Sequence, residues 1–118
     1  HGVGCFLNVH ENPPSISKNS KIKFEDGMIV SNEPGYYKEN HYGIRIENLI
    51  LSKLSNGTIT FKTITIAPFE RLLIDQSLLT ANEINWVNRY HKRVRDILMP
   101  SMNSHERGWL INQTAPLQ

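Results

Sequence analysis

The chain has 118 residues, of which 39% are hydrophobic and 20% charged, so its size suits one domain and its composition excludes wholesale disorder and collagen-like repeats. Thirteen Lys and Arg against eleven Asp and Glu give a net charge of +2 without a long basic block, which argues against a nucleic-acid partner. No apolar run is long enough to span a bilayer. The single cysteine, Cys5, cannot form an internal disulfide and fits a reducing compartment.

The chain opens on His1 and Gly2 rather than on methionine. Its first residues read as the interior of a domain and lack the pattern of a signal peptide. We therefore expect the chain to be a piece of a longer protein, and a full core to be lacking, because a small chain buries proportionally little of its surface.

The first part of the chain is rich in β-branched residues and is punctuated by Gly and Pro. The pattern predicts strands or extended segments at 3–9, 27–33, 43–51 and 58–66, with a Pro13–Pro14 breaker and an aromatic loop at 36–42 between them. Asn56–Gly57 predicts a β-hairpin because both residues tolerate positive φ.

The second part of the chain predicts helices. Thr80 and Glu83 form the pattern of a capping box at a helix start, and five residues then recur at spacings of three and four: Ile84, Val87, His91, Val94 and Leu98. Such spacing places them on one helical face, and Pro100 ends the helix. A second, short helix is expected at 104–112.

Two histidines, His1 and His10, stand nine residues apart at the two ends of the first extended segment. In a regular strand an odd offset places them on opposite faces, whereas Gly2 and Gly4 favour a bend that would relax this rule. Two interpretations stay open, a shared functional site or two unrelated polar residues near a loop.

Two glutamates, Glu33 and Glu47, each end or interrupt an apolar strand. A carboxylate in such a position needs a cationic partner or a metal if it is buried. Arg45 lies two residues before Glu47 and therefore shares its face of the strand. The alternative interpretation leaves one face of each strand in water, with Arg45 pairing one carboxylate.

Three blocks of sequence together resemble one enzyme family. They read His-Gly-Val-Gly-x-x-Leu-x-Val-His-Glu-x-Pro at 1–13, Gly-Met-x-Val-Ser-Asn-Glu-Pro-Gly-Tyr-Tyr at 27–37 and Tyr-Gly-Ile-Arg-Ile-Glu-Asn-Leu at 42–49. In this order they look like the catalytic domain of the Xaa-Pro aminopeptidases (aminopeptidase P), of the creatinase/methionine-aminopeptidase "pita-bread" family. The tail, with Trp86-x-x-x-Tyr90-His91 and Trp109-Leu110-Ile111, resembles the C-terminal extension of the long, three-domain branch and disfavours prolidase.

This resemblance implies an α+β fold, the C-terminal half of a pita-bread domain. Such a half-domain is a mostly antiparallel curved sheet followed by C-terminal helices. We expect residues 1–69 to form the half-domain and residues 70–118 to form the helical extension of the long aminopeptidase P type.

The resemblance also assigns roles to individual residues. In the family, the positions of His1 and Glu33 ligate metal and that of Glu47 bridges two metal ions. Glu33 also takes part in proton transfer, so Glu33 and His10 are the expected catalytic residues. His10 would lie beside the substrate, and we expect both His1 and His10 to contact it. Arg45 would orient the site.

The function implied is that of a dinuclear-metal Xaa-Pro aminopeptidase, which releases the N-terminal residue from peptides with proline in second position. One imidazole among carboxylates suits Mn²⁺, and Zn²⁺ or Co²⁺ could also bind. Two of the family's five ligands are aspartates upstream of the His1 motif, and Asp26, Asp75 and Asp96 lie in the wrong motifs to replace them. We therefore expect the isolated chain to be inactive and to hold no metal ion, or one weakly held ion.

The expected partners are a proline-containing peptide and either a second copy of the chain or the rest of its parent, in the cytoplasm, with no nucleic acid and no membrane. A half-domain exposes strand edges and apolar faces, and the expected helices carry the aromatic anchors Trp86, Tyr90 and Trp109. The alternative function is that of a truncated, non-catalytic pita-bread remnant that acts in binding or assembly.

Overall fold

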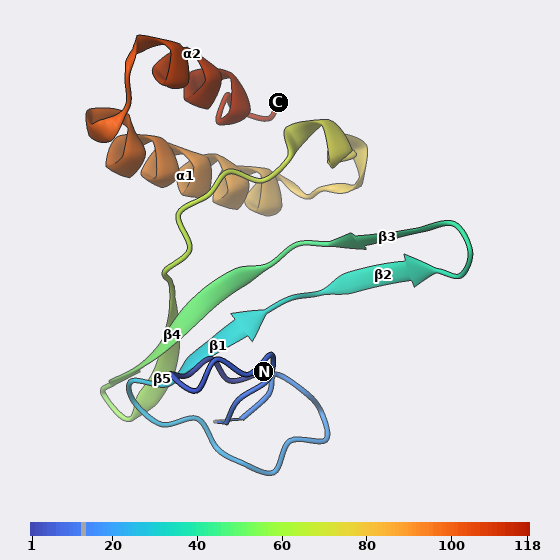
Figure 1. Cartoon of the computed structure of the whole chain (residues 1–118), viewed down its shortest axis with the longest axis vertical. Coiled ribbons are helices and arrows are strands. Elements are labelled where there is room, and N and C mark those ends of the chain that lie inside the picture. Colours follow the sequence, from blue (N-terminus) through green and yellow to red (C-terminus); the bar gives the residue numbers. More distant parts are fainter. Residues whose placement is uncertain (13) are drawn as a thin grey trace. The chain divides into compact units, whose positions relative to one another are not determined.

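Two compact units, His1–Thr65 and Ile66–Gln118, make up the computed structural model, which describes residues 1–12 and 14–118. The described strands lie in the first unit and the described α-helices in the second (Figure 1). The predicted α+β class, with antiparallel sheets followed by helices, is therefore confirmed. Pro13, half of the predicted breaker, lies outside the described residues.

A three-stranded antiparallel sheet forms the body of the first unit. Its strands are β1 (Ile29–Asn32), β4 (Asn48–Ser55) and β5 (Thr58–Thr63), in the order β1-β4-β5. β4 and β5 are joined by the predicted Asn56–Gly57 turn, where both residues have positive φ, 50° and 77°. The hairpin prediction is confirmed, because this pair adopts the left-handed conformation that the turn needs.

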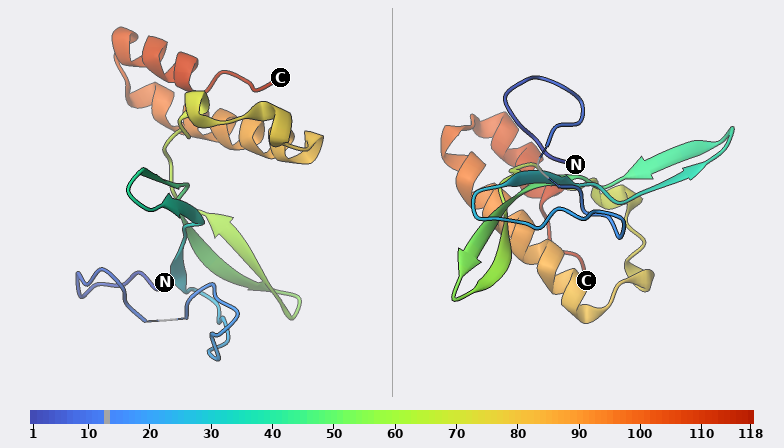
Figure 2. Two further views of the ribbon diagram at one scale, coloured as in Figure 1. Left: turned by 90° about the vertical axis from the view of Figure 1, so that its right-hand side faces the viewer. Right: turned by 90° about the horizontal axis from the view of Figure 1, so that it is seen from below.

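A second, two-stranded hairpin corrects two sequence-based expectations. β2 (Gly35–Lys38) pairs with β3 (Tyr42–Arg45), where an aromatic loop and part of one long strand were predicted. Figure 2 shows this hairpin extending away from the three-stranded sheet. The Tyr37 ring explains the pairing, since it lies against Gly43 so closely that a Cβ there would be 2.7 Å from it. Because Gly43, the cross-strand partner of Tyr37, has no side chain, the Tyr37 ring can pack against the backbone of β3.

The strand predicted at 3–9 is absent from the described structure, which has a closed loop there. Gly2 and Glu11 form an isolated antiparallel bridge that ties the two ends of the loop. The Glu11 side chain accepts a hydrogen bond from the Asn8 backbone at 2.9 Å. The same carboxylate lies so close to Gly4 that a Cβ at that position would clash with it. The side chain of Glu11 therefore fills the loop from inside.

The first unit buries few apolar side chains. Among its described residues, Val30 and Ile50 are the buried hydrophobic ones, and the buried polar residues of the sheet are Ser31, Asn48 and Ser52. Several large apolar side chains of the unit are exposed instead: Phe6, Leu7, Val9, Ile16, Ile22, Ile44, Ile46 and Leu54. The described part of the first unit therefore leaves many of its large apolar side chains uncovered.

The second unit is a pair of helices, α1 (Ala81–Leu98) and α2 (Ser104–Gln113), which lie side by side in both views of Figure 2. The predicted capping box of Thr80 and Glu83 is present at the start of α1. The backbone N–H and the hydroxyl of Thr80 both donate to the Glu83 carboxylate, and these hydrogen bonds lower the pKa of Glu83. A core of Tyr90, Val94 and Leu110 joins the helices. No described helix is long and apolar enough to cross a membrane.

Short 3₁₀ helices complete the second unit. They are η1 (Arg71–Leu73), η2 (Gln76–Leu78) and η3 (Met99–Ser101), the last of which contains Pro100 and follows α1 directly. Proline has no N–H to continue the α-helical ladder. As predicted, the long helix α1 ends just before Pro100, at Leu98.

His91 is fully buried on the apolar face of α1. Its Nε2 accepts a hydrogen bond from the Phe69 backbone at 3.0 Å, so we assign the ring proton to Nδ1. Burial, followed by the positive charges of Arg71 and Arg95, lowers the pKa of His91. Protonation would also place an N–H where the lone pair now meets the Phe69 N–H, and would break that bond.

The neutrality of His91 makes the second unit sensitive to acid. Because the folded-state pKa is lowered, an unfolded chain takes up the proton first, so stability is full above about pH 6.5 and falls as the pH drops below that value. We expect the midpoint of urea unfolding, followed by helical circular dichroism, to fall between pH 7 and pH 5. His91→Gln keeps an acceptor for Phe69 and should flatten this dependence.

The exposed His105 of α2 provides the matched control. His105→Gln should leave the pH dependence of the unfolding midpoint unchanged. An equal dependence in the wild type and in His91→Gln would contradict this assignment.

Candidate functional site

One imidazole and two carboxylates converge in the first unit. His1, Glu33 and Glu47 each offer a potential ligand atom, and these three atoms lie within 4.8 Å of one another. His1 and Glu33 are partly buried, whereas Glu47 is more exposed. The structure thus brings together the three residues that the sequence singles out as candidate metal ligands.

Backbone pairing along β1 places the first two of these residues. The Ser31 amide donates to the His1 carbonyl oxygen at 2.8 Å, and the Val3 amide donates to the Ile29 carbonyl oxygen at 3.0 Å. These bonds hold the start of the chain along one edge of β1. Glu33 follows β1 directly, so both side chains emerge at the same end of this strand.

Pairing on the other edge of β1 places Glu47. Asn32 and Asn48 face each other at the end of the β1–β4 ladder, and Glu33 and Glu47 lie one residue beyond this pair. The Ile46 amide then donates to the Pro34 carbonyl oxygen at 3.2 Å, just before the second hairpin begins. The two glutamates therefore stand where one sheet ends and the other starts.

The His1 ring has an oxygen opposite each nitrogen. Nδ1 lies 2.7 Å from the Gly2 carbonyl oxygen, and Nε2 lies 3.1 Å from Oε1 of Glu33. A carbonyl can only accept, so Nδ1 carries a proton. A neutral ring then directs its Nε2 lone pair toward the carboxylate, an arrangement that either a second proton or a cation must satisfy. Bonding at Nδ1 is also how metal-ligating histidines are oriented.

Arg45 lies between the two glutamates. Its Nη1 is 3.7 Å from Oε2 of Glu33 and its Nε is 3.2 Å from Oε2 of Glu47. A hydrogen bond to the Tyr37 hydroxyl and the nearby carboxylates raise the pKa of Arg45. The ion pairs and the cluster of candidate ligands therefore occur together, so the two interpretations of these glutamates are not exclusive.

His10 also reaches this site. Its ring meets that of His1 edge-on, with 4.6 Å between centroids and 80° between planes. The expectation that a strand would separate the two rings does not apply, because residues 4–10 form a loop that returns to its start. His10 is exposed and lines a small hollow of about 330 Å³ together with Glu11, which leaves it accessible to a ligand.

Each aspartate of the chain has a structural contact elsewhere. Asp26 accepts a hydrogen bond from the Leu54 backbone at 2.8 Å. Asp75 caps η2, and Asp96 pairs with Lys92 on α1. Within residues 1–12 and 14–118, none of the three belongs to the group of candidate ligands.

Two residues of the site were missed in the sequence, Ser31 and Tyr37. The Ser31 hydroxyl donates to Oε1 of Glu33 at 2.8 Å, and Tyr37 bonds to Arg45. Ser31 could have been found, because residues two apart on a strand share a face. Tyr37 could not, since its position depends on the hairpin that the sequence pattern did not predict.

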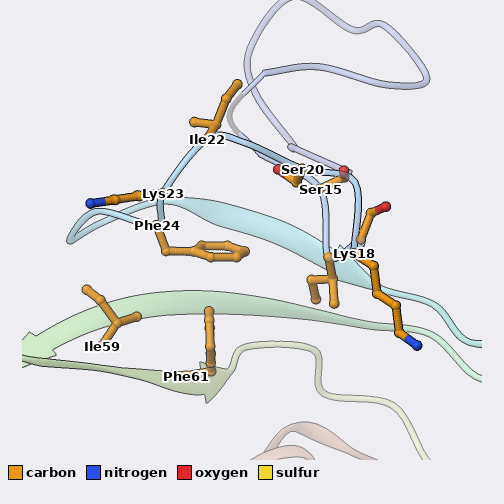
Figure 3. Close-up of a pocket in the computed structure, with 10 residues that line it drawn as sticks. Ser15, Lys18, Ser20, Ile22, Lys23, Phe24, Ile59 and Phe61 are labelled. Atoms are coloured by element: carbon orange, nitrogen blue, oxygen red, sulfur yellow. The ribbon is translucent and has the colours of Figure 1, made fainter.

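A larger, open groove of about 710 Å³ lies between the loop at 15–24 and β5. Figure 3 shows Phe24 of the loop facing Ile59 and Phe61 of β5 across it, and the two phenyl rings meet edge-to-face at 5.0 Å. Its lining contains no carboxylate and no histidine, so the groove offers none of the ligand types found in the cluster of His1, Glu33 and Glu47.

Comparison with known proteins identifies the family. Residues 1–53 match metallopeptidase family M24, and residues 57–117 match the C-terminal region of peptidase M24. The chain belongs to the M24 metallopeptidases. The family predicted from the three sequence blocks is thereby confirmed.

Several sequence relatives of this M24 chain are named as aminopeptidases. Aminopeptidase P1 of Lotus japonicus is 42% identical over 127 residues, which cover 99% of this chain and 19% of that protein. Xaa-Pro aminopeptidase 1 of Dictyostelium discoideum is 42% identical over 130 residues, covering 99% and 21%. The chain thus spans about a fifth of the length of these relatives.

A solved structure supports the fold. X-prolyl aminopeptidase from Caenorhabditis elegans, described as a cytosolic enzyme with a di-nuclear active site, matches with a TM-score of 0.81 and 35% identity. The match covers 99% of this chain and 21% of that structure. The M24 chain therefore has the fold of the corresponding part of a pita-bread aminopeptidase.

The donor set fits a divalent transition-metal ion. One imidazole and two carboxylates are ligands that Mn²⁺ and Zn²⁺ accept, and the unshared Nε2 lone pair of His1 faces the carboxylates. Three donors are fewer than the four to six that such ions usually take. His1, Glu33 and Glu47 are therefore an incomplete but chemically suitable set.

We expect the isolated chain to bind at most one Mn²⁺ ion, weakly, because three donors leave its coordination unfilled. In NMR spectra, added Mn²⁺ should broaden the signals of His1, Glu33 and Glu47 first. Asp26 of the same unit, which bonds to the Leu54 backbone and is not among the candidate ligands, provides an internal reference that should broaden less. Two fully occupied ions in this chain, without ligands from another polypeptide, would contradict the expectation.

Proposed function

We propose that the complete polypeptide containing this chain is a metal-dependent Xaa-Pro aminopeptidase, which removes the N-terminal residue from peptides with proline in second position. The observation that carries the proposal is the convergence of His1, Glu33 and Glu47 within 4.8 Å. The similarity to aminopeptidases over 99% of the chain agrees with it. We further propose that residues 1–69 belong to the catalytic domain and residues 70–118 to its C-terminal extension.

In this proposal the metal ligands are His1 through Nε2 and the carboxylates of Glu33 and Glu47. Two divalent cations, which we propose to be Mn²⁺, would supply Lewis acidity that activates a water molecule and polarises the scissile carbonyl. Zn²⁺ and Co²⁺ are the alternatives. The di-nuclear site described for the C. elegans enzyme supports the number of ions.

The protein's own side chains would orient the reaction. Glu33 is held by the Ser31 hydroxyl at Oε1 and by Arg45 at Oε2, so its carboxylate has a defined position from which to accept and return a proton. The accessible His10 ring lies against His1 and would donate a hydrogen bond to the substrate carbonyl. Proline has no amide hydrogen, so a donor to that carbonyl is a means of recognising it.

Two substitutions in the complete polypeptide separate the ligand role from the substrate role. Glu47→Ala should abolish cleavage of an Xaa-Pro peptide and lower the metal content. His10→Ala should leave the metal content nearly intact and lower kcat by roughly 10²- to 10⁴-fold, the range for a lost proton-transfer group. Metal analysis beside steady-state kinetics measures both effects.

His41 provides the control for histidine replacement. It lies exposed in the turn between β2 and β3, where its Nδ1 meets the Glu39 carbonyl oxygen. His41→Ala should preserve both kcat and metal content. Loss of metal in His10→Ala would mean that His10 is a ligand rather than a substrate contact.

We also propose that the polypeptide works as a homodimer, in the cytoplasm, with the helical unit taking part in the interface. The stacked aromatic group of Phe69, Trp86 and Tyr90 supports this, because Trp86 keeps 44% of its surface exposed. Trp109 of α2 is 50% exposed. Partly exposed tryptophans are typical anchors of interfaces.

Light scattering tests this association. We expect the 118-residue chain to self-associate, and Trp86→Ala together with Trp109→Ala to shift it toward the monomer. Replacing Phe6 with Ser in the first unit is the control for a general loss of apolar surface. A monodisperse monomer at high concentration, with a cooperative thermal transition, would overturn the proposal of self-association.

A further inference from the structure

We propose that Ser31 is a positioning residue for the metal site, because its hydroxyl links the backbone of His1 to the carboxylate of Glu33 and so presents these two ligands together. The inference rests on the metal site of the proposed function. It adds a residue that contacts no substrate and donates no ligand atom.

The hydrogen bonds of Ser31 carry the inference. Its backbone N–H donates to the His1 carbonyl oxygen at 2.8 Å. Its Oγ accepts from the terminal amino group of His1, the first nitrogen of this chain, at 3.1 Å and donates to Oε1 of Glu33 at 2.8 Å. One serine therefore holds both sides of the His1 backbone and the side chain of Glu33.

The single hydroxyl proton has a preferred acceptor. The Glu33 oxygen is 2.8 Å from Oγ, whereas the His1 carbonyl oxygen is 3.4 Å away. A hydrogen bond to an ionised carboxylate is also stronger than one to a neutral carbonyl. The proton therefore points toward Glu33, and the oxygen lone pairs remain for the His1 N–H.

The surroundings of Ser31 make this arrangement rigid. Its relative exposure is 1%, so water does not compete for the hydroxyl. Ser31 and Glu33 share a face of the extended chain, while Arg45 approaches the other carboxylate oxygen of Glu33. Both oxygens of Glu33 thus have a partner, which restricts rotation of the carboxylate before any ion binds.

A matched control lies in the neighbouring strand. Ser52 of β4 is also fully buried, and its hydroxyl bonds to the backbone of Glu25 and Met28. It contacts none of the candidate ligands among the described residues. Removing either hydroxyl should destabilise the sheet, but only the loss of the Ser31 hydroxyl should release Glu33.

The experiment measures Mn²⁺ affinity by calorimetry in the complete polypeptide, with the thermal transition of each metal-free variant beside it. Outer partners of metal ligands typically contribute 10- to 100-fold to affinity. We expect Ser31→Ala to bind Mn²⁺ 10- to 100-fold more weakly than the wild type, Ser31→Thr to recover most of the affinity, and Ser52→Ala to bind normally.

The outcomes separate this inference from the function on which it rests. If the wild type binds no Mn²⁺, Zn²⁺ or Co²⁺, the proposed function itself is wrong. If the wild type binds but Ser31→Ala binds equally well, Ser31 has no positioning role. Equal losses in Ser31→Ala and Ser52→Ala, or a folded Ser31→Thr that binds as weakly as Ser31→Ala, would likewise overturn the inference.

Discussion

Backbone pairing along both edges of β1 is the constraint on which the candidate site depends. One edge bonds to the segment that carries His1, and the other to β4, whose first residue follows Glu47. Side chains alternate along a strand, so a slip of one residue would turn Glu33 to the opposite face. The geometry of the candidate ligands is thus a consequence of strand register, and the individual side chains refine it.

Local patterns in the sequence were sufficient for much of the fold. The capping box at Thr80, the helical face through His91 and the Asn56–Gly57 turn each depend on residues close to one another in the chain, and each is found as predicted. Glu33 and Glu47 stood out for a similar reason, because a carboxylate at the end of an apolar run needs an explanation. Their family context then supplied the candidate role.

The remaining features depend on contacts that a local pattern does not contain. The loop at 4–10 closes because the Glu11 carboxylate fits beside Gly4, and the β2–β3 hairpin forms with Tyr37 lying against Gly43. In both cases a glycine makes room for a side chain that folds back against it. The loop is what brings His10 to His1, so the relation between the two histidines could not be decided from their spacing.

The position of Arg45 has a consequence for how an ion would be exchanged. Its guanidinium lies beside the carboxylates of both Glu33 and Glu47, so its positive charge lowers the total negative charge of these side chains. Coulombic attraction scales with this total, so an incoming divalent cation is held less strongly than by the carboxylates alone. Because half of the Arg45 side chain is exposed, solvent and salt screen this repulsion, so the reduction is partial. Such a cluster favours a metal that equilibrates with the surrounding pool over one that is bound permanently.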